Sequence, residues 1–167
     1  MENGLIVLGL DPGTRVTGYG IVREISGQAE LVATGTIRTP VKRDMATRMG
    51  FIFDKVRELI LRHSPAEAAI ENVFVSKNPS SALKLGQARG ACMAACATSN
   101  LPMGEYEPAK VKKNLVGVGN APKSQVAFMV AHCLGIKKPD WPEDASDALA
   151  IAICHLNERR MRKLTGM

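Results

Sequence analysis

The chain has 167 residues, of which 46% are hydrophobic, so it can form one domain with a proper core and is not expected to be disordered. No apolar run approaches the roughly 20 residues that span a bilayer, and the segment before the first apolar run is too short and too acidic for a signal peptide, so we expect a cytoplasmic protein without a membrane segment. The net charge is +6, and residues 72–139 alone carry nine basic and two acidic residues, which favours a polyanionic partner.

The first predicted element is a strand over Leu5–Leu10, which is apolar on both faces and therefore predicts the central strand of a covered sheet. Asp11 follows it, before a Pro-Gly turn and a returning strand over Gly18–Val22. Asp11 has two possible roles. It either caps the turn through its own side chain or serves as a ligand at the open end of the strand.

Glu30–Arg38 predicts a third strand that completes an antiparallel meander, and Asp44 is expected to cap a core-covering helix that runs to about Arg62. The segment Glu67–Val75 then reads as another buried strand. It carries a second carboxylate, Glu71, after an apolar run, and the following loop contains Phe74 and Lys77.

Asn78 or Ser80 should cap a long helix that ends near Ser99. Gly86, Gly90 and Ala94 recur every four positions in it, and helical glycine is costly, so we expect another backbone to approach closely there. That backbone belongs either to the sheet or to a second copy of the chain, and we favour the second copy. In the same helix Cys92 and Cys96 favour packed, reduced thiols over a metal site.

A short strand over Met103–Tyr106 precedes a brief helix that begins at Pro108. Its basic residues are Lys110, Lys112 and Lys113. A glycine-rich loop follows, with Pro122 at an expected first helical position and Lys123 in the first turn of a helix that ends near Leu134. The exposed amides of that turn, together with Lys123, predict a phosphate-binding position.

The last helix is expected to begin near Glu143. Asp144 and Asp147 are three residues apart and so project from one face of its first turn, either as a cap and dipole partner or as ligands. His155 lies in an apolar stretch and is interpreted as packed. We place a single domain at residues 1–158 and a basic, flexible tail at 159–167.

Four carboxylates thus stand at the ends of apolar elements, namely Asp11, Glu71, Asp144 and Asp147. If they converge they repel one another unless divalent cations neutralise them, and oxygen-only ligands select Mg²⁺ or Mn²⁺. Two such ions per site are the usual arrangement for phosphodiester cleavage. Together with the basic segment, the cluster predicts a metal-dependent nuclease.

Five sequence blocks carry a resemblance to a known family, in the same order and over almost the whole chain. They are LGLDPGTRVTGYG, IENVF, SALKLGQARG, VKKNLVGVGNAPKSQV and DASDALAIAI. With these blocks the sequence resembles the RuvC family of Holliday junction resolvases. The resemblance implies a ribonuclease H-like α/β fold with a mixed five-stranded sheet flanked by helices, and a homodimer that nicks two opposed strands of a four-way DNA junction in recombination and repair.

The resemblance also implies roles for individual residues. The family's four acidic positions fall on the four carboxylates above, and some members carry histidine where Asp144 stands. Phe74 matches its junction-facing aromatic, and Lys112 and Lys123 match its DNA-contacting lysines. We expect Lys123 to stabilise charge at the phosphate, with Lys77, Lys84 and Arg89 holding junction arms. The branch-migration complex of RuvA and RuvB is the implied partner.

Three other functions fit parts of the sequence. In sugar kinases and actin-like ATPases the first phosphate loop also follows an acid-ended strand and contains glycines. Those proteins need two such domains, however, and 167 residues will not hold them. A non-catalytic module that binds structured nucleic acid would fit the charge, although it has no need of four acids. A ribonuclease acting on structured RNA is the nearest enzymatic alternative.

Overall fold

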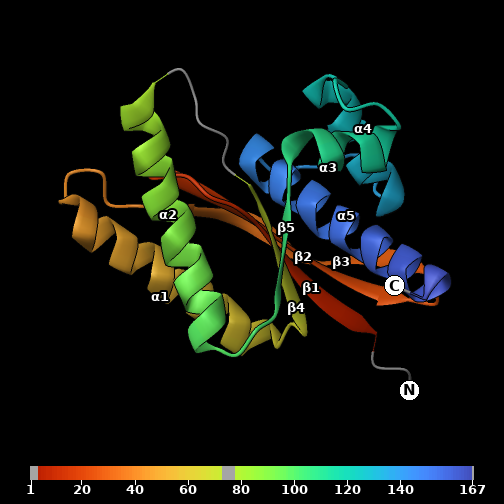
Figure 1. The fold of residues 1–167 in the computed structure, drawn as a ribbon, viewed down its shortest axis with the longest axis horizontal. Coiled ribbons are helices and arrows are strands. Elements are labelled where there is room, and N and C mark those ends of the chain that lie inside the picture. Colours follow the sequence, from red (N-terminus) through yellow and green to blue (C-terminus); the bar gives the residue numbers. More distant parts are fainter. Residues whose placement is uncertain (1–3, 73–77, 167) are drawn as a thin grey trace.

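The computed structural model describes residues 4–72 and 78–166, and it contains one five-stranded sheet with helices on both faces (Figure 1). The strands are β1 Leu5–Asp11, β2 Val16–Ile25, β3 Gln28–Arg38, β4 Glu67–Glu71 and β5 Met103–Tyr106. The helices are α1 Met45–His63, α2 Pro79–Thr98, α3 Pro108–Val116, α4 Lys123–Cys133 and α5 Glu143–Thr165. The predicted mixed five-stranded α/β architecture is confirmed.

The sheet has the strand order β3-β2-β1-β4-β5, with β1 in the centre. β1 pairs antiparallel with β2 and parallel with β4, and β4 pairs parallel with β5. Phe74 and Lys77, for which the sequence predicts contacts with DNA, lie outside the described residues. Because β1, β4 and β5 run in the same direction, their carboxyl ends meet at one edge of the sheet, where α/β proteins place their sites.

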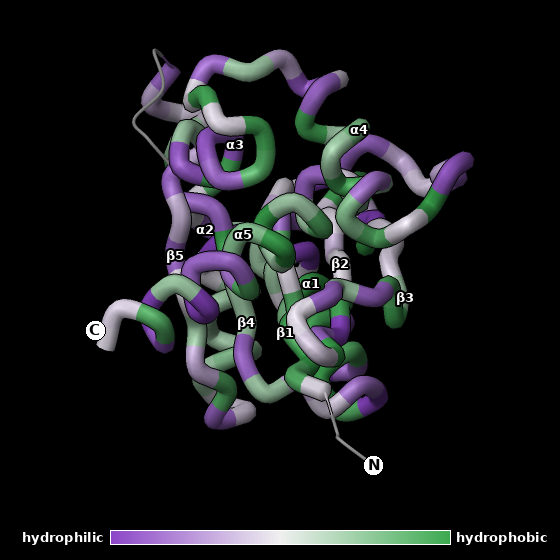
Figure 2. Tube along the Cα trace, turned by 90° about the vertical axis from the view of Figure 1, so that its right-hand side faces the viewer, coloured by the Kyte–Doolittle hydropathy of each residue, from purple (hydrophilic) through white to green (hydrophobic). Residues whose placement is uncertain are grey.

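Both faces of β1 are buried, as its apolar run predicts. Val7 belongs to a cluster formed with α3, α4 and α5, whereas Leu8 and Leu10 belong to a cluster formed with α1 and α2. Figure 2 shows hydrophobic stretches of β1 and α5 meeting in the middle of the molecule. Side chains alternate along a strand, so residues 7, 9 and 11 of β1 face α5.

Glycines let α5 approach the sheet closely. A methyl group at Gly9 would overlap the carbonyl oxygen of Ala148, one at Gly18 would overlap that of Asp144, and one at Gly20 would meet the Leu149 side chain. Gly86 and Gly90 of α2, to which the sequence analysis gave such a role, have no atom within 4 Å of an added methyl group in the described chain. The close approach inside the chain therefore occurs between α5 and strands β1 and β2, not at α2.

The caps of the helices mostly agree with the prediction. Asp44 caps α1 by accepting a hydrogen bond from the Thr47 amide, and Asn78 caps α2. Pro122 is the N-cap of α4 instead of its first helical residue, so the helix starts at Lys123. Cys92 and Cys96 are buried, and burial raises the pKa of each thiol to about 12.

Helix α5 continues well beyond residue 158, where the sequence analysis ended the domain. It runs to Thr165, and two of its arginines are ion-paired to strands. The Arg159 Nε lies 2.8 Å from a carboxylate oxygen of Glu67, and the Arg160 guanidinium lies 2.8 Å from one of Glu24. The boundary at 158 therefore does not coincide with the end of an element. Charge alone indicated a tail, whereas the structure keeps residues 159–165 helical and pairs Arg159 and Arg160 with acids on β4 and β2.

Candidate active site at the carboxyl ends of the parallel strands

Asp11 and Glu71 are neighbours at the edge where β1 and β4 end. Leu10 pairs with Ile70 in the parallel ladder, so the next residue of each strand lies beside the other at the strand spacing of about 4.8 Å. Asp11 shares the face of Gly9, and Glu71 shares the face of Ala69, which packs in the α5 cluster. Both carboxylates therefore project toward α5.

The first turn of α5 brings the other two acids to the same place. Gly18 is paired with Asp11 across the β1–β2 ladder, and the backbone of Asp144 rests on Gly18. Asp144 and Asp147 thus stand over the end of β1. The α5 N-cap is Pro142, which makes no side-chain capping bond, so neither aspartate acts as the N-cap residue.

The turn after β1 is closed without Asp11. The Gly13 amide donates to the Thr17 hydroxyl at 3.2 Å, and that hydroxyl donates to the Gly13 carbonyl at 3.0 Å. Among the described residues Asp11 makes no side-chain hydrogen bond. Of the two roles that the sequence allowed, turn capping belongs to Thr17, and the Asp11 carboxylate is left facing the other acids.

Electrostatics show how closely the four acids are associated. The pKa of Asp11 is raised from 3.8 to about 7, first by burial and then by repulsion from Asp147, Glu71 and Asp144. Burial, followed by repulsion from Asp147, also raises the pKa of Glu71. Burial likewise raises the pKa of Asp147, against a hydrogen bond from Lys123 that lowers it. The acids form one interacting cluster that carries more negative charge than its surroundings neutralise.

Two of the predicted lysines lie at this cluster. The Lys123 ammonium, at the start of α4, is 3.2 Å from Asp147 and 2.8 Å from Glu143, and it lowers the pKa of Asp11 and Glu71. Lys112 on α3 also lowers the pKa of Glu71. Glu143, which the sequence analysis did not assign, holds Lys123 beside the acids. Its position next to Asp144 in the chain was the available signal.

Arg89 bonds to other residues of the chain, and its predicted contact with a junction arm stays a prediction. From α2 its guanidinium donates to the Glu71 carbonyl at 3.1 Å and to the Asn72 side chain at 2.9 Å, and it pairs with Glu105. These bonds hold the end of β4 from which the Glu71 carboxylate projects. Lys84 is exposed on the same helix, and its predicted DNA contact stays a prediction.

The donor set suits a hard divalent cation because it consists of carboxylate oxygens with raised proton affinity. Within residues 4–72 and 78–166, no three acids, histidines or thiols have the geometry to hold an ion together. Mutual repulsion opposes closer convergence of the acids until cations neutralise them. The residues fit a metal site by chemistry and by location.

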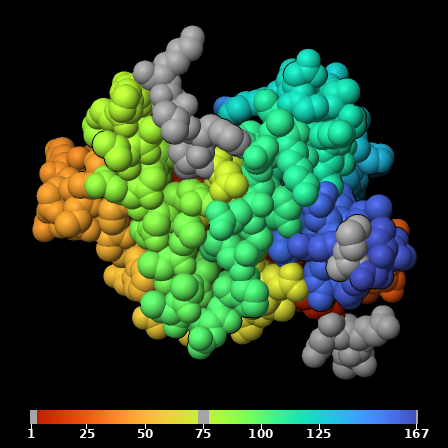
Figure 3. All heavy atoms as spheres, in the orientation of Figure 1, coloured from red at the N-terminus to blue at the C-terminus, as the bar shows by residue number. Residues whose placement is uncertain are grey.

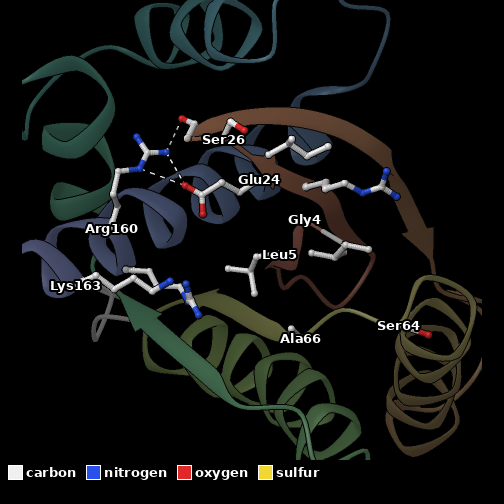
Figure 4. Close-up of a pocket in the computed structure, with 13 residues that line it drawn as sticks. Gly4, Leu5, Glu24, Ser26, Ser64, Ala66, Arg160 and Lys163 are labelled. Carbon is white, nitrogen blue, oxygen red and sulfur yellow. Dashed lines mark hydrogen bonds and ion pairs between the residues drawn. The ribbon is translucent and has the colours of Figure 1, made fainter. Parts of the chain in front are cut away.

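A cavity of about 1030 Å³ lies at the opposite end of the sheet from the four acids, where β1 begins and α5 ends (Figure 4). It is lined by Arg23, Glu24, Arg159, Arg160 and Lys163 among others, and two of these arginines already pair with strand carboxylates. It contains one acid and lies far from the four-acid cluster. Cavity size alone would therefore misplace the site.

Comparison with known proteins shows the family of the chain. The family model described as crossover junction endodeoxyribonuclease RuvC matches residues 7–155. The chain belongs to the RuvC family. It is 58% identical to the crossover junction endodeoxyribonuclease RuvC of Solidesulfovibrio magneticus, over 96% of this chain and 95% of that protein.

Solved RuvC structures share the fold. The Thermus thermophilus RuvC structure superposes with a TM-score of 0.86 at 34% identity, covering 94% of this chain and 96% of that one. T. thermophilus RuvC in complex with a Holliday junction substrate gives a TM-score of 0.84 at 33% identity, with the same coverage. The ribonuclease H-like fold implied by the sequence blocks is thus confirmed for this RuvC family member. None of its described helices is long and apolar enough to cross a membrane.

Proposed function

We propose that this protein is a metal-dependent endonuclease that resolves four-way DNA junctions in recombination and repair, in the cytoplasm, by paired symmetric nicks. The single observation that carries this proposal is the cluster of four carboxylates from β1, β4 and α5, flanked by Lys112 and Lys123. Family membership supports it, as does the junction complex of T. thermophilus RuvC.

In the proposed mechanism Asp11, Glu71, Asp144 and Asp147 would hold two Mg²⁺ ions, for which Mn²⁺ could substitute. Bound there, such ions would supply a lowered pKa for an attacking water and positive charge beside the leaving 3′ oxygen. The water oxygen bonds to phosphorus as the bond from phosphorus to the 3′ oxygen breaks, which gives 5′-phosphate and 3′-hydroxyl ends. Lys123 then exchanges its carboxylate partners for a phosphate oxygen, and Lys112 holds the adjoining backbone by its charge. Phe74, Lys77, Lys84 and Arg89 keep their predicted DNA contacts as part of this proposal, although the bonds of Arg89 favour a role in positioning Glu71.

A homodimer is part of the proposal because a four-way junction offers two equivalent cleavage points, which a two-fold pair of sites matches. The outer face of α2 supports this arrangement. Leu83 is 72% exposed there, and Gly86, Gly90 and Ala94 lie exposed beside it. In Figure 3, α2 forms much of the face turned to the viewer, and the described chain leaves that face open. RuvA and RuvB are the proposed branch-migration partners.

The deciding experiment is a strand-resolved cleavage map of the wild-type protein on a mobile four-way DNA junction with Mg²⁺. We expect nicks at symmetric positions on two opposed strands, with much weaker cleavage of duplex and flap DNA. Competition with an RNA junction separates DNA resolution from a ribonuclease. Binding without any Mg²⁺-dependent nicking would instead identify a non-catalytic module.

Gly18→Ala tests whether the close packing of α5 on Gly18 positions the acids. The added methyl group overlaps the Asp144 carbonyl, so the first turn of α5 must shift, and we expect nicking to fall about 100-fold with a loss of about 1–3 kcal/mol in unfolding free energy. Single-turnover cleavage and urea unfolding measure the two effects. The matched control is Gly50→Ala on α1, which has open space, lies away from the α2 face, and should stabilise the fold by up to about 1 kcal/mol without changing nicking. Equal nicking rates for the two variants would show that the close packing of α5 on Gly18 is not needed to position the acids.

A further inference from the structure

An aromatic side chain on α4 is exposed beside the candidate active site. The Phe128 side chain is 69% exposed, whereas Val126 and Val130 of the same helix are buried. The His132 ring lies one turn further on and is nearly parallel to the Phe128 ring, with an interplanar angle of 12° and ring centroids 6.3 Å apart. The two nearly parallel rings lie next to each other on the outside of the helix, and we name this pair the α4 platform.

The α4 platform borders a groove that carries positive charge. The groove has a volume of about 670 Å³ and is lined by both rings together with Ser124, Ile136, Lys137 and Pro139 among others. No acidic side chain lines it, and Lys137 forms no ion pair with the described residues. A flat aromatic face next to an unneutralised lysine is the combination that binds single-stranded nucleic acid, with bases on the ring and phosphates on the cation.

The groove is continuous with the acid cluster. Ala127 and Pro139 line both the groove and a smaller neighbouring cavity that contains Lys123 and Asp147. Phe128 follows Lys123 by five residues, which is about 7.5 Å along the axis of a helix, and each phosphate of a duplex strand advances about 3.4 Å along the duplex axis. The α4 platform therefore lies within a few nucleotides of a phosphate held at Lys123.

We propose that the α4 platform binds the DNA strand next to the scissile phosphate, with a base stacked on Phe128 and a neighbouring phosphate on Lys137. This inference rests on the proposed function, because it assumes that the DNA strand is bound at the four-acid cluster. The groove adjoins that cluster and has no acidic side chain in its own lining, and both features favour a DNA strand over a protein partner. The site would be additional to the contacts assigned to Phe74, Lys112 and Lys123.

The test compares Phe128→Ala with Phe128→Trp and with Leu61→Ala. Leu61 is 74% exposed on α1, on the other face of the sheet, so it controls for loss of an exposed apolar side chain. Junction affinity is measured by fluorescence anisotropy in EDTA. We expect about tenfold weaker binding for Phe128→Ala and wild-type affinity for the other two variants. Lys137→Gln should weaken binding and flatten its salt dependence.

Photocrosslinking locates the contact directly. Junctions with 5-iododeoxyuridine one to four nucleotides from the nicked phosphate should crosslink to α4 in the wild-type protein and lose that adduct in Phe128→Ala. Unchanged affinity together with no α4 adduct would overturn the proposal, and so would a change of sedimentation in Phe128→Ala without a change in junction binding, which would indicate a protein contact. Failure of the proposed function is distinguishable, because the wild-type protein itself would then neither nick nor prefer the junction.

Discussion

Asp11→Asn protein should bind a four-way junction with wild-type affinity and nick it at least about 1000-fold more slowly. Asp11 lies at the centre of the cluster, since Asp147, Glu71 and Asp144 all act on its pKa. Asparagine keeps the size of the side chain but removes the negative charge that holds a divalent cation. Binding depends on lysines and should survive, because the substitution removes negative charge from a surface that meets phosphates.

The experiment measures single-turnover nicking with saturating protein in Mg²⁺, and junction affinity in EDTA. Asp54→Asn is the matched control, because Asp54 is exposed on α1 and has no ion-pair partner among the described residues. It should nick like the wild type. Glu71→Gln should follow Asp11→Asn, because the two carboxylates are neighbours on β1 and β4. Mg²⁺-dependent nicking by Asp11→Asn at the wild-type rate would refute the assignment of the active site.

The metal-free protein should lose stability as the pH rises from about 5 to 8, and Mg²⁺ should restore it. The folded-state pKa of Asp11 is about 7, above its ordinary value of 3.8, so its contribution to stability is fully present below about pH 4 and is lost as the pH rises through 7. That difference in pKa corresponds to at most about 4 kcal/mol, and solvent around the half-buried carboxylate reduces it. Glu71 and Asp147 act in the same direction.

Other carboxylates act in the opposite direction at lower pH. The pKa of Glu67 is lowered, although its burial opposes this, because Arg159 and His155 bond to its charged form. Its stabilising effect is present above its ordinary value of 4.5 and is lost as the pH falls. The metal-free protein should therefore be most stable near pH 5, between the two effects.

Thermal unfolding in EDTA and in Mg²⁺ at pH 5, 7 and 8 measures this dependence. Mg²⁺ binds the folded cluster, so its stabilisation should grow from pH 5 to pH 8 as the acids ionise. Asp11→Asn should unfold at a higher temperature than the wild type at pH 8 in EDTA and respond little to Mg²⁺. A melting temperature that rises steadily from pH 5 to 8 in EDTA, with no Mg²⁺ effect in the wild type, would contradict a repelling acid cluster.

A buried network explains why α5 keeps its place along the sheet. The His155 ring bonds through Nδ1 to the Tyr106 hydroxyl at 2.8 Å and through Nε2 to Glu67 at 2.7 Å. Glu67 also accepts from Arg159, and Gly104 leaves room for the ring. His155 was expected to be packed, and it is. Its partners lie on β4 and β5, so this network anchors the helix whose first turn carries Asp144 and Asp147.

Local pattern was enough for much of this protein. The apolar run before Asp11 implied a strand covered on both faces, and the spacing of Asp144 and Asp147 implied one helical face, because both features depend only on neighbouring residues. The sequence blocks implied the family, the mixed sheet and the four acids. Each of these properties is a repeat or a motif that can be read without knowing what the segment contacts.

The tertiary structure alone decided which distant segments meet. It assigned the close helix approach to Gly9, Gly18 and Gly20 instead of Gly86 and Gly90, turned Arg89 toward Glu71, and extended α5 through the basic residues after 158. It also left Phe128 exposed in a groove that adjoins the cavity containing Lys123 and Asp147. A glycine, an arginine or a phenylalanine has the same local signature whether it faces a helix, a carboxylate or solvent, because its partner lies far away in the chain and only folding brings the two together.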